Sequence, residues 1–250
     1  MGSKSPTLLI DGDLVLHKVL AAIETDVDWG DGVSSIFSNH KDCQEVIRGM
    51  IRGWCTMFGT KNIRIALTGS TNFRKDLYSD YKGNRTTRKP VGWKPMKDWL
   101  FAKGNARSVA GIEADDLIGI WATQGKLNDP IIISDDKDFR SIPGSLFVPR
   151  SNELVSTTLE GADRYHLHQT LVGDRADNYK GCPGIGDVKA GAILRTDTGE
   201  PGELWGRVVE CFLAAGLTEE DALLQARLAR ILRAEDFDFK TRKPILWRPE

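Results

Sequence analysis

Short apolar runs alternate along the first half of the chain with longer segments whose apolar residues recur every three or four positions. Runs of the length of a buried strand occupy residues 8–10, 62–67 and 131–133. Segments of helical period occupy residues 15–23, 43–58 and 113–123. Strands that alternate with helices are typical of parallel sheets, so the pattern predicts an α/β fold with a central, mostly parallel sheet flanked by helices.

The pattern changes beyond about residue 150. Runs at residues 146–148 and 153–155 allow one or two more strands. The remainder predicts helices at residues 162–172, 187–195, 203–215 and 219–233. Residues 25–39, rich in Gly, Asp and Ser, are predicted to be a loop. We therefore expect an α/β core over residues 1–150 and a helical lobe over residues 151–250.

Composition narrows the class of protein. The 250 residues are 40% hydrophobic and 28% charged, values that exclude disordered, collagen-like and coiled-coil chains. The four cysteines lack the spacing of a zinc site or a disulfide scaffold. No apolar run approaches the ~18 residues of a membrane span, and the N-terminus lacks a signal-peptide core. We expect a cytoplasmic protein without a membrane partner.

A net charge of −1 argues against a nucleic-acid partner only until its distribution is considered. Residues 72–108 hold ten basic and three acidic residues, so this segment carries +7 and the remainder −8. Aromatic residues are interleaved with the cations: Tyr78, Tyr81, Trp93 and Trp99. Such a segment suits a surface that neutralises phosphates and stacks bases, although an ordinary charged helix and loop is the alternative.

Acidic residues gather at two places in the core half. Asp11 and Asp13 follow the first predicted strand, and residues two apart in extended backbone point the same way. Glu113, Asp115 and Asp116 open a helix, where residues three apart share a face. Acids in a first helical turn also complement the macrodipole, which gives this second group a structural alternative.

Two further acidic groups lie later in the chain. Asp135, Asp136 and Asp138 directly follow the third predicted strand, and crowded carboxylates repel one another unless a cation or a proton intervenes. Asp174 and Asp177 lie in Gly-Asp-Arg-Ala-Asp-Asn, where helical backbone would place both on one face. Carboxylates without His or Cys suit Mg²⁺ or Mn²⁺, and their number favours two ions.

A glycine turn precedes the helix predicted at residues 187–195. Free N–H groups at Gly184-Ile185-Gly186 can hold a phosphate, although a plain helix-connecting turn is the alternative. A dinucleotide-binding motif is excluded because Lys189 takes the third glycine position and no strand precedes the turn.

In this order the motifs resemble those of the flap endonuclease/5′→3′ exonuclease superfamily, above all its bacteriophage branch in short-tailed lytic phages. The matching segments are Asp11–Asp13, Tyr81–Arg85, Glu113–Asp116, Ser134–Phe139, Gly173–Asn178 and Gly184–Gly186, with Ala229–Arg233 and Leu246–Pro249 near the C-terminus. The resemblance implies a PIN-like 5′ nuclease core, a basic helical arch at about residues 72–108 and a helix-hairpin-helix at about residues 172–195.

The resemblance also implies a function. It predicts a two-metal nuclease dependent on Mg²⁺ or Mn²⁺ that hydrolyses DNA from 5′ ends, nicks or flaps. We expect it to act in phage DNA replication or recombination in the host cytoplasm, as a monomer, with RNA–DNA hybrids as a further candidate substrate. Asp11, Glu113, Asp115 and Asp116 would hold one ion, and Asp136, Asp138, Asp174 and Asp177 the other. Asp13 and Asp135 match the pattern less well.

The family's basic and aromatic residues are carried over in the same way. Lys82 and Arg85 would be catalytic, meeting the scissile phosphate and its developing charge. Tyr81 would stack on a terminal base. The remaining DNA-binding candidates are Arg74, Lys89, Gly184, Ile185, Gly186 and Lys189, and K⁺ could bind at the glycine turn.

One departure stands out. The family usually carries a metal-binding aspartate after its second strand, whereas this chain has Leu67-Thr68-Gly69-Ser70. Asp13, Ser70 or a water could substitute, or activity could be reduced.

Two rival interpretations follow from the same residues. A haloacid-dehalogenase-type phosphatase would use Asp11 as nucleophile, with Thr68 and Gly173-Asp174 as its other motifs. It leaves the group at residues 113–116, the basic segment and the glycine turn unexplained. The second rival is a catalytically weakened binder of DNA junctions, in which Gly69 would mark the loss of a metal ligand.

Overall fold

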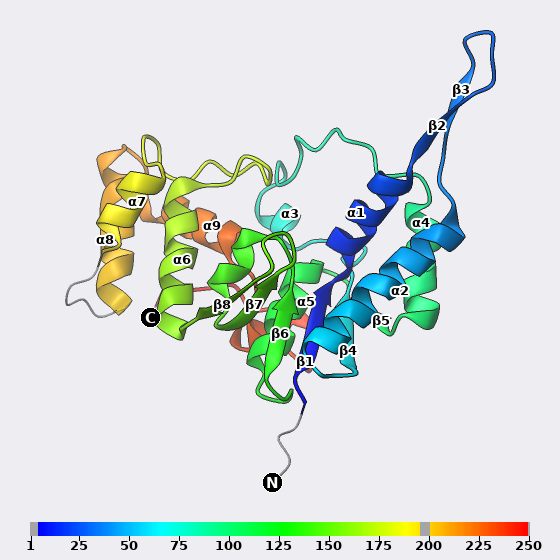
Figure 1. The fold of residues 1–250 in the computed structure, drawn as a ribbon. Helices are drawn as coiled ribbons and strands as arrows, with labels where there is room; N and C mark the ends of the chain where they lie inside the picture. Colours follow the sequence, from blue (N-terminus) through cyan, green and yellow to red (C-terminus); the bar gives the residue numbers. More distant parts are fainter. Residues whose placement is uncertain (1–4, 196–200, 250) are drawn as a thin grey trace.

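The protein, described here by a computed structural model for residues 5–195 and 201–249, is built around one six-stranded sheet (Figure 1). The sheet order is β5-β4-β1-β6-β7-β8. Its strands are β1 (Thr7–Asp11), β4 (Asn62–Ala66), β5 (Ala106–Arg107), β6 (Pro130–Ile133), β7 (Gly144–Val148) and β8 (Glu153–Thr157). Neighbours pair in parallel except β7 with β8. The predicted mostly parallel sheet is confirmed.

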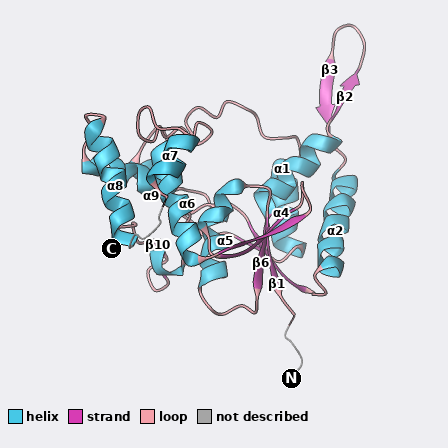
Figure 2. Ribbon diagram, turned by 60° about the vertical axis from the view of Figure 1, so that its left-hand side comes forward, coloured by secondary structure: helices cyan, strands magenta, loops and turns pink. Residues whose placement is uncertain are grey.

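Helices cover both faces of the sheet (Figure 2). On one face lie α1 (Gly12–Ile23), α2 (His40–Met57) and α4 (Trp93–Lys103), and on the other lies α5 (Ala114–Thr123). The alternation along β1 serves both faces, because Leu8 and Ile10 belong to the core with α1 and Leu9 to the core with α5.

The second half of the chain adds a group of helices with a core of its own. It comprises α6 (Leu159–Val172), α7 (Asp187–Ile193), α8 (Pro201–Ala214) and α9 (Glu219–Ala229). Leu171, Phe212 and Ala226 are fully buried at its centre. Helix α9 ends at Ala229 instead of Arg233, because the next residues turn back to pack against α5, where the Leu232 N–H donates to Asp116.

The short elements complete the fold. They are the helix α3 (Arg74–Leu77), the 3₁₀ helices η1 (Lys137–Ser141) and η2 (Ala234–Asp236), and the strands β9 (Phe237–Asp238) and β10 (Lys243–Pro244).

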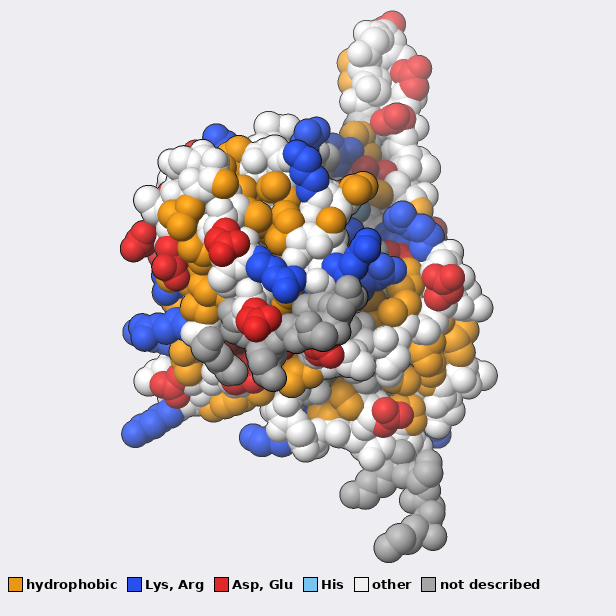
Figure 3. All heavy atoms as spheres, turned by 90° about the vertical axis from the view of Figure 1, so that its left-hand side faces the viewer, with side chains coloured by type: hydrophobic (Ala, Val, Ile, Leu, Met, Phe, Trp, Pro, Cys, Tyr) orange, Lys and Arg blue, Asp and Glu red, His pale blue; other side chains and the backbone are white. Residues whose placement is uncertain are grey.

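The prediction of a loop at residues 25–39 is wrong. Strands β2 (Thr25–Asp28) and β3 (Ser34–Phe37) form a hairpin that projects from the body (Figures 1 and 3). Three successive residues at its tip, Gly30-Asp31-Gly32, have positive φ, as tight hairpin turns require. The Gly, Asp and Ser residues of this segment give it a composition typical of loops, so its two short strands could not be recognised from composition.

The predicted helical arch is only partly helical. Residues 78–92 run over the carboxyl edge of the sheet as turns and extended backbone between α3 and α4 (Figure 1). Gly83, Pro90 and Gly92 disfavour helix here, and Lys82 itself adopts a left-handed conformation with φ of 56°.

The segment with Asp174 and Asp177 is also not helical. Asp174 and Tyr179 exchange backbone hydrogen bonds of 2.9 and 3.0 Å, which close a tight loop. Gly173 and Gly181 flank it so closely that a Cβ on either would lie 2.4 Å from the backbone of the opposite strand. Both have positive φ, so glycine is needed at these positions for the loop to close.

Arg74 joins three parts of the fold in the interior. Its side chain is 2% exposed and its guanidinium binds the fully buried Asp116 through two bonds of 2.8 and 2.7 Å. The same guanidinium donates to the carbonyls of Leu228 and Arg230. The prediction that Arg74 contacts DNA is therefore wrong, because this side chain is enclosed by protein and holds α3, α5 and the end of α9 together.

Replacing Arg74 with Met should destabilise the protein by about 3 kcal/mol or more, since it leaves Asp116 buried without its cation. Thermal unfolding monitored by circular dichroism measures the loss. In the double variant Arg74→Met/Asp116→Leu much of the stability should return. A double variant as unstable as the two single changes added together would contradict a dominant ion pair.

Candidate metal centre and active site

The acidic groups that lie far apart in the sequence meet at the carboxyl edge of β1 and β6. Asp11 is the last residue of β1, and Ser134 to Asp138 follow β6. The Glu113 group lies at the start of α5, and the loop of residues 173–181 approaches from the helical lobe. Ligand sites of parallel sheets lie at this edge.

Asp11 is held at the floor of the site by two hydrogen bonds. Its carboxylate accepts from the Leu14 N–H at 3.0 Å, as the N-cap of α1, and from the Ser134 hydroxyl at 3.1 Å. Burial raises the pKa of Asp11 to about 6, with the charges of Asp13 and Asp136 acting in the same direction. A cation beside Asp11 would remove this penalty.

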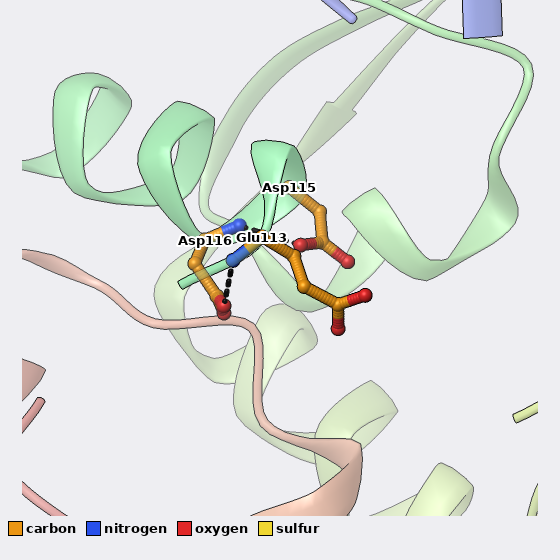
Figure 4. A group of neighbouring side chains, drawn as sticks. All are labelled: Glu113, Asp115 and Asp116. Atoms are coloured by element: carbon orange, nitrogen blue, oxygen red, sulfur yellow. Dashed lines mark hydrogen bonds between the residues drawn. The ribbon is translucent and has the colours of Figure 1, made fainter. Parts of the chain in front are cut away.

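Glu113, Asp115 and Asp116 offer oxygens that lie within 4.8 Å of one another. In Figure 4 the carboxylates of Glu113 and Asp115 point the same way, whereas Asp116 points away from them. Asp116 accepts from Arg74 and from the N–H groups of Glu113 and Leu232. Its oxygens are thus engaged by the protein, so Asp116, which was predicted to be a ligand of the first ion, instead supports the group from behind.

The basic segment places two side chains against this group. The Lys82 ammonium lies 2.5 Å from Glu113 Oε1 and 3.4 Å from Asp177 Oδ2. The Tyr81 hydroxyl lies 3.0 Å from Glu113 and 2.8 Å from Asp177, and links the two acids. Burial opposes ionisation of Glu113, but the charges of Lys82 and Arg74 outweigh it and lower its pKa to about 2.

The predicted stacking of Tyr81 on a base is not possible in this structure. The side chain is 2% exposed, and both its ring and its hydroxyl are enclosed by protein. Sequence alone presents Tyr81 as one of several aromatics in a basic segment, and the two acids that bind it lie 32 and 96 residues away.

Asp136, Asp138, Asp174 and Asp177 form the second acidic group. Burial raises the pKa of Asp138 to about 7, and the charges of Asp136 and Asp174 add to the effect. Burial also raises the pKa of Asp136, with the charge of Asp177 contributing. The four carboxylates are therefore near enough to repel one another.

Arg85 and its neighbours fasten the basic segment to this second group. Arg85 lies 2.6 Å from Asp177, and the Lys82 N–H donates to the Asp177 carbonyl at 2.9 Å. Asn84 donates to the Arg175 carbonyl and Asn178 donates to the Asp80 carbonyl. Of the two predicted catalytic cations, Lys82 thus lies between the two groups of carboxylates, and Arg85 lies beside the second group alone.

Two further residues, Ser134 and Lys18, contact the acidic groups although the sequence did not predict a role for either. Ser134 donates to Asp11 and accepts from the Asp136 N–H, so it joins the ends of β1 and β6. Lys18 forms an ion pair with Asp135, whose side chain is 4% exposed. Asp135 is therefore occupied within the protein, in keeping with its weaker match. The sequence signal for this ion pair was a lysine within the largely apolar pattern of residues 15–23.

The other DNA-binding candidates lie on the surface. Lys89 is exposed and its ammonium lies over the Trp93 ring. Gly184 and Gly186 are exposed, and Lys189 donates to the Gly184 carbonyl. A groove of about 570 Å³ runs between this turn and the loop of residues 174–180. The glycine turn therefore lies beside the second acidic group, as their closeness in sequence predicted.

The residues present fit divalent cations. Asp13 Oδ1 and Asp138 Oδ1 are inaccessible to solvent and have no hydrogen-bond partner among the described residues. Anionic oxygens in this state are costly unless a cation is close. All donors of the site are carboxylates, which suits hard ions.

Comparison with known proteins identifies the family. Residues 6–146 match the model of the 5′-3′ exonuclease N-terminal resolvase-like domain. The chain belongs to this family of nucleases. A phosphatase of the haloacid dehalogenase type is thereby set aside.

Relatives agree with this assignment, and a solved structure shares the fold. The exonuclease of Escherichia phage T7 is 30% identical over 97% of this chain and 93% of its own. The exodeoxyribonuclease of Enterobacteria phage T3 is 29% identical over 97% and 92%. The fold resembles a T5 5′-exonuclease with zinc bound, with a TM-score of 0.64 at 16% identity over 89% of this chain and 88% of that one.

Among the described residues, no helix is long and apolar enough to cross a membrane.

The raised pKa of Asp138 predicts how stability depends on pH without metal. The ionised Asp138 carboxylate lowers the free energy of unfolding by its full amount above pH 7. This loss diminishes as the pH falls from 7 toward 3.8, the pKa of Asp138 in the unfolded chain. In chelator at pH 8, Asp138→Asn should therefore unfold about 5 °C higher than the parent, a gain of roughly 2 kcal/mol.

The stabilisation of Asp138→Asn over the parent should fall by about half at pH 5.5. Mg²⁺ at pH 8 should stabilise the parent more than the variant. Equal unfolding temperatures in chelator at pH 8 would show that Asp138 is not under repulsion.

Proposed function

We propose that this protein is a divalent-metal-dependent 5′→3′ exonuclease of DNA that also cuts flaps in a structure-selective way. The observation that carries the proposal is the meeting of the acidic groups with Lys82 and Arg85 from the basic segment. Solved relatives of the same fold include a flap endonuclease of phage T5 in a product complex with DNA and metal ions. DNA is therefore the substrate class that both the charge pattern and the family favour.

Two ions fit the distribution of the donors. Asp11, Glu113 and Asp115 would hold one ion, supported by Asp116, and Asp136, Asp138, Asp174 and Asp177 would hold the other. When bound, Mg²⁺ or Mn²⁺ would activate water and neutralise charge on the phosphate.

The residues of the chain have separate tasks in this proposal. Lys82 lies between the two acidic groups and Arg85 beside the second, and each would exchange a carboxylate for the scissile phosphate as it enters. Asp11 and Ser134 fix the floor of the site. Residues 78–92 lie over it, so a single strand with a free 5′ end would pass beneath or beside this segment.

The duplex part of the substrate would follow the groove toward the helix-hairpin-helix. The N–H groups of Gly184 and Gly186 and the ammonium of Lys189 would bind backbone phosphates there, with K⁺ as a candidate ion at the turn. The Ile185 N–H already donates to the Cys182 carbonyl, so Ile185 would contact DNA through its side chain. Lys89 would contact phosphates near the 5′ end. RNA–DNA hybrids as substrate, the monomeric state and work in the host cytoplasm remain predictions.

The experiment compares duplex DNA labelled at the 5′ end, duplex labelled at the 3′ end and a 5′ flap, with Mg²⁺, with Mn²⁺ and with chelator. We expect metal-dependent release of short products from the 5′ label and progressive shortening of the 3′-labelled strand. Binding without cleavage with either metal would favour the weakened junction binder.

The variant Asp136→Ala should lower the cleavage rate by about 10²-fold or more, because it removes charge stabilisation at the second ion. DNA binding, measured by fluorescence anisotropy, should persist. Glu45→Ala, an exposed acid on α2, is the matched control and should cleave at the parental rate. Parental cleavage by Asp136→Ala would remove the proposed role of this residue.

A further inference from the structure

We propose that Asp13 supplies the carboxylate that the family usually draws from the position after its second strand, where this chain has Gly69. The proposal rests on the proposed function, since it concerns the first ion of that site. It assigns the site a ligand from the first turn of α1 in place of one from the end of β4.

The turn after β4 has no room for a side chain at residue 69. A Cβ on Gly69 would lie 2.1 Å from the Val109 carbonyl oxygen and 3.1 Å from that of Ile112. The Gly69 N–H donates to the same Ile112 carbonyl at 3.1 Å. The turn is thus tied against residues 109–112, and an aspartate at position 69 would require this backbone to move.

The neighbouring residues of the turn do not replace the missing carboxylate. The Thr68 hydroxyl accepts from the Ala114 N–H at the start of α5. The Thr68 carbonyl accepts from the Lys97 ammonium. Ser70 is exposed and carries no charge. The turn therefore lies at the start of the Glu113 group without contributing an anionic oxygen of its own.

Asp13 reaches this turn from the other side. Its Oδ2 accepts from the Thr68 N–H at 2.9 Å. Its Oδ1 is inaccessible to solvent and has no hydrogen-bond partner among the described residues. One oxygen thus anchors the carboxylate to the residue before Gly69, and the other lacks the positive partner that an ion would supply.

Gly12 makes the approach possible. A Cβ on Gly12 would lie 2.6 Å from the Ala66 carbonyl and 2.7 Å from the Ile65 side chain, at the end of β4. Without a side chain there, the first turn of α1 packs directly on β4 and carries Asp13 to Thr68. The Asp-Gly-Asp motif therefore carries two carboxylates, Asp11 from the strand and Asp13 from the helix, close enough for the charge of Asp13 to raise the pKa of Asp11.

The test is Asp13→Asn. The amide oxygen of Asn can still accept from Thr68, so the variant removes the charge and keeps the anchoring bond. Mn²⁺ binding is measured by calorimetry and by electron paramagnetic resonance of the free ion, with unfolding temperature in chelator as the control for folding. We expect at least about tenfold weaker binding of one ion, with an unfolding temperature equal to or above the parental one, because repulsion with Asp11 is relieved.

Three outcomes would overturn the proposal. Parental Mn²⁺ affinity in Asp13→Asn would show that the first ion does not use this carboxylate. A lower unfolding temperature in chelator with unchanged metal binding would make Asp13 a structural residue only. Failure of the parent itself to bind Mn²⁺ would overturn the proposed function as well, which separates that failure from the failure of Asp13 alone.

Gly69→Asp gives the reciprocal test. If Gly69 marked a decayed site, the restored aspartate would strengthen Mn²⁺ binding and rescue Asp13→Asn. We expect instead a lower unfolding temperature in chelator and no rescue, because the new Cβ meets the Val109 carbonyl. Rescue of metal binding by Gly69→Asp would contradict the close packing on which the proposal depends.

Discussion

Mutual repulsion among carboxylates at one edge of a sheet is the constraint around which this protein is built. The acids come from the end of β1, the start of α5, the end of β6 and the loop after α6. Three of these four groups are paired with cations of the chain: the α5 group through Arg74 with Asp116 and Lys82 with Glu113, the group after β6 through Lys18 with Asp135, and the loop after α6 through Arg85 with Asp177. The elements that carry these cations are held in place by them, so charge balance and tertiary structure cannot be separated here.

The side chains of these four cations differ in how far they are exposed to solvent. Arg74 is buried and bound on all sides, and its removal would leave a carboxylate in the core. Lys82 and Arg85 lie on a segment without regular helix, and the Arg85 side chain is 55% exposed. The Lys82 side chain is 14% exposed and pairs with both Glu113 and Asp177, whereas Arg85 pairs with Asp177 alone. The deep pair thus fixes the fold, and Lys82 and Arg85 fasten residues 78–92 to the acidic groups.

Local patterns predicted the parts of this molecule that are set by nearby residues. The apolar runs located β1, β4 and β6, and the acids that follow two of them lie at one edge because parallel strands end together. Contacts between distant segments were not predictable in the same way. Arg74 and Tyr81 looked like DNA-binding residues, since the acids that bury them are 32 to 96 residues away. The hairpin of residues 25–37 and the closed loop of residues 173–181 depend on positive-φ positions that composition alone presents as ordinary loop.

Gly69 shows how such distant contacts change the meaning of a sequence departure. By sequence, the loss of an aspartate indicates a weakened site. In the structure the same glycine lets the turn after β4 pack against residues 109–112, and Gly12 lets α1 pack against the end of β4. The two glycines bring Thr68 and Asp13 together, so that a carboxylate from α1 lies beside the turn after β4. In the proposed site the number of charges around the first ion is therefore kept while their origin in the chain changes, which the motif at the end of one strand does not reveal.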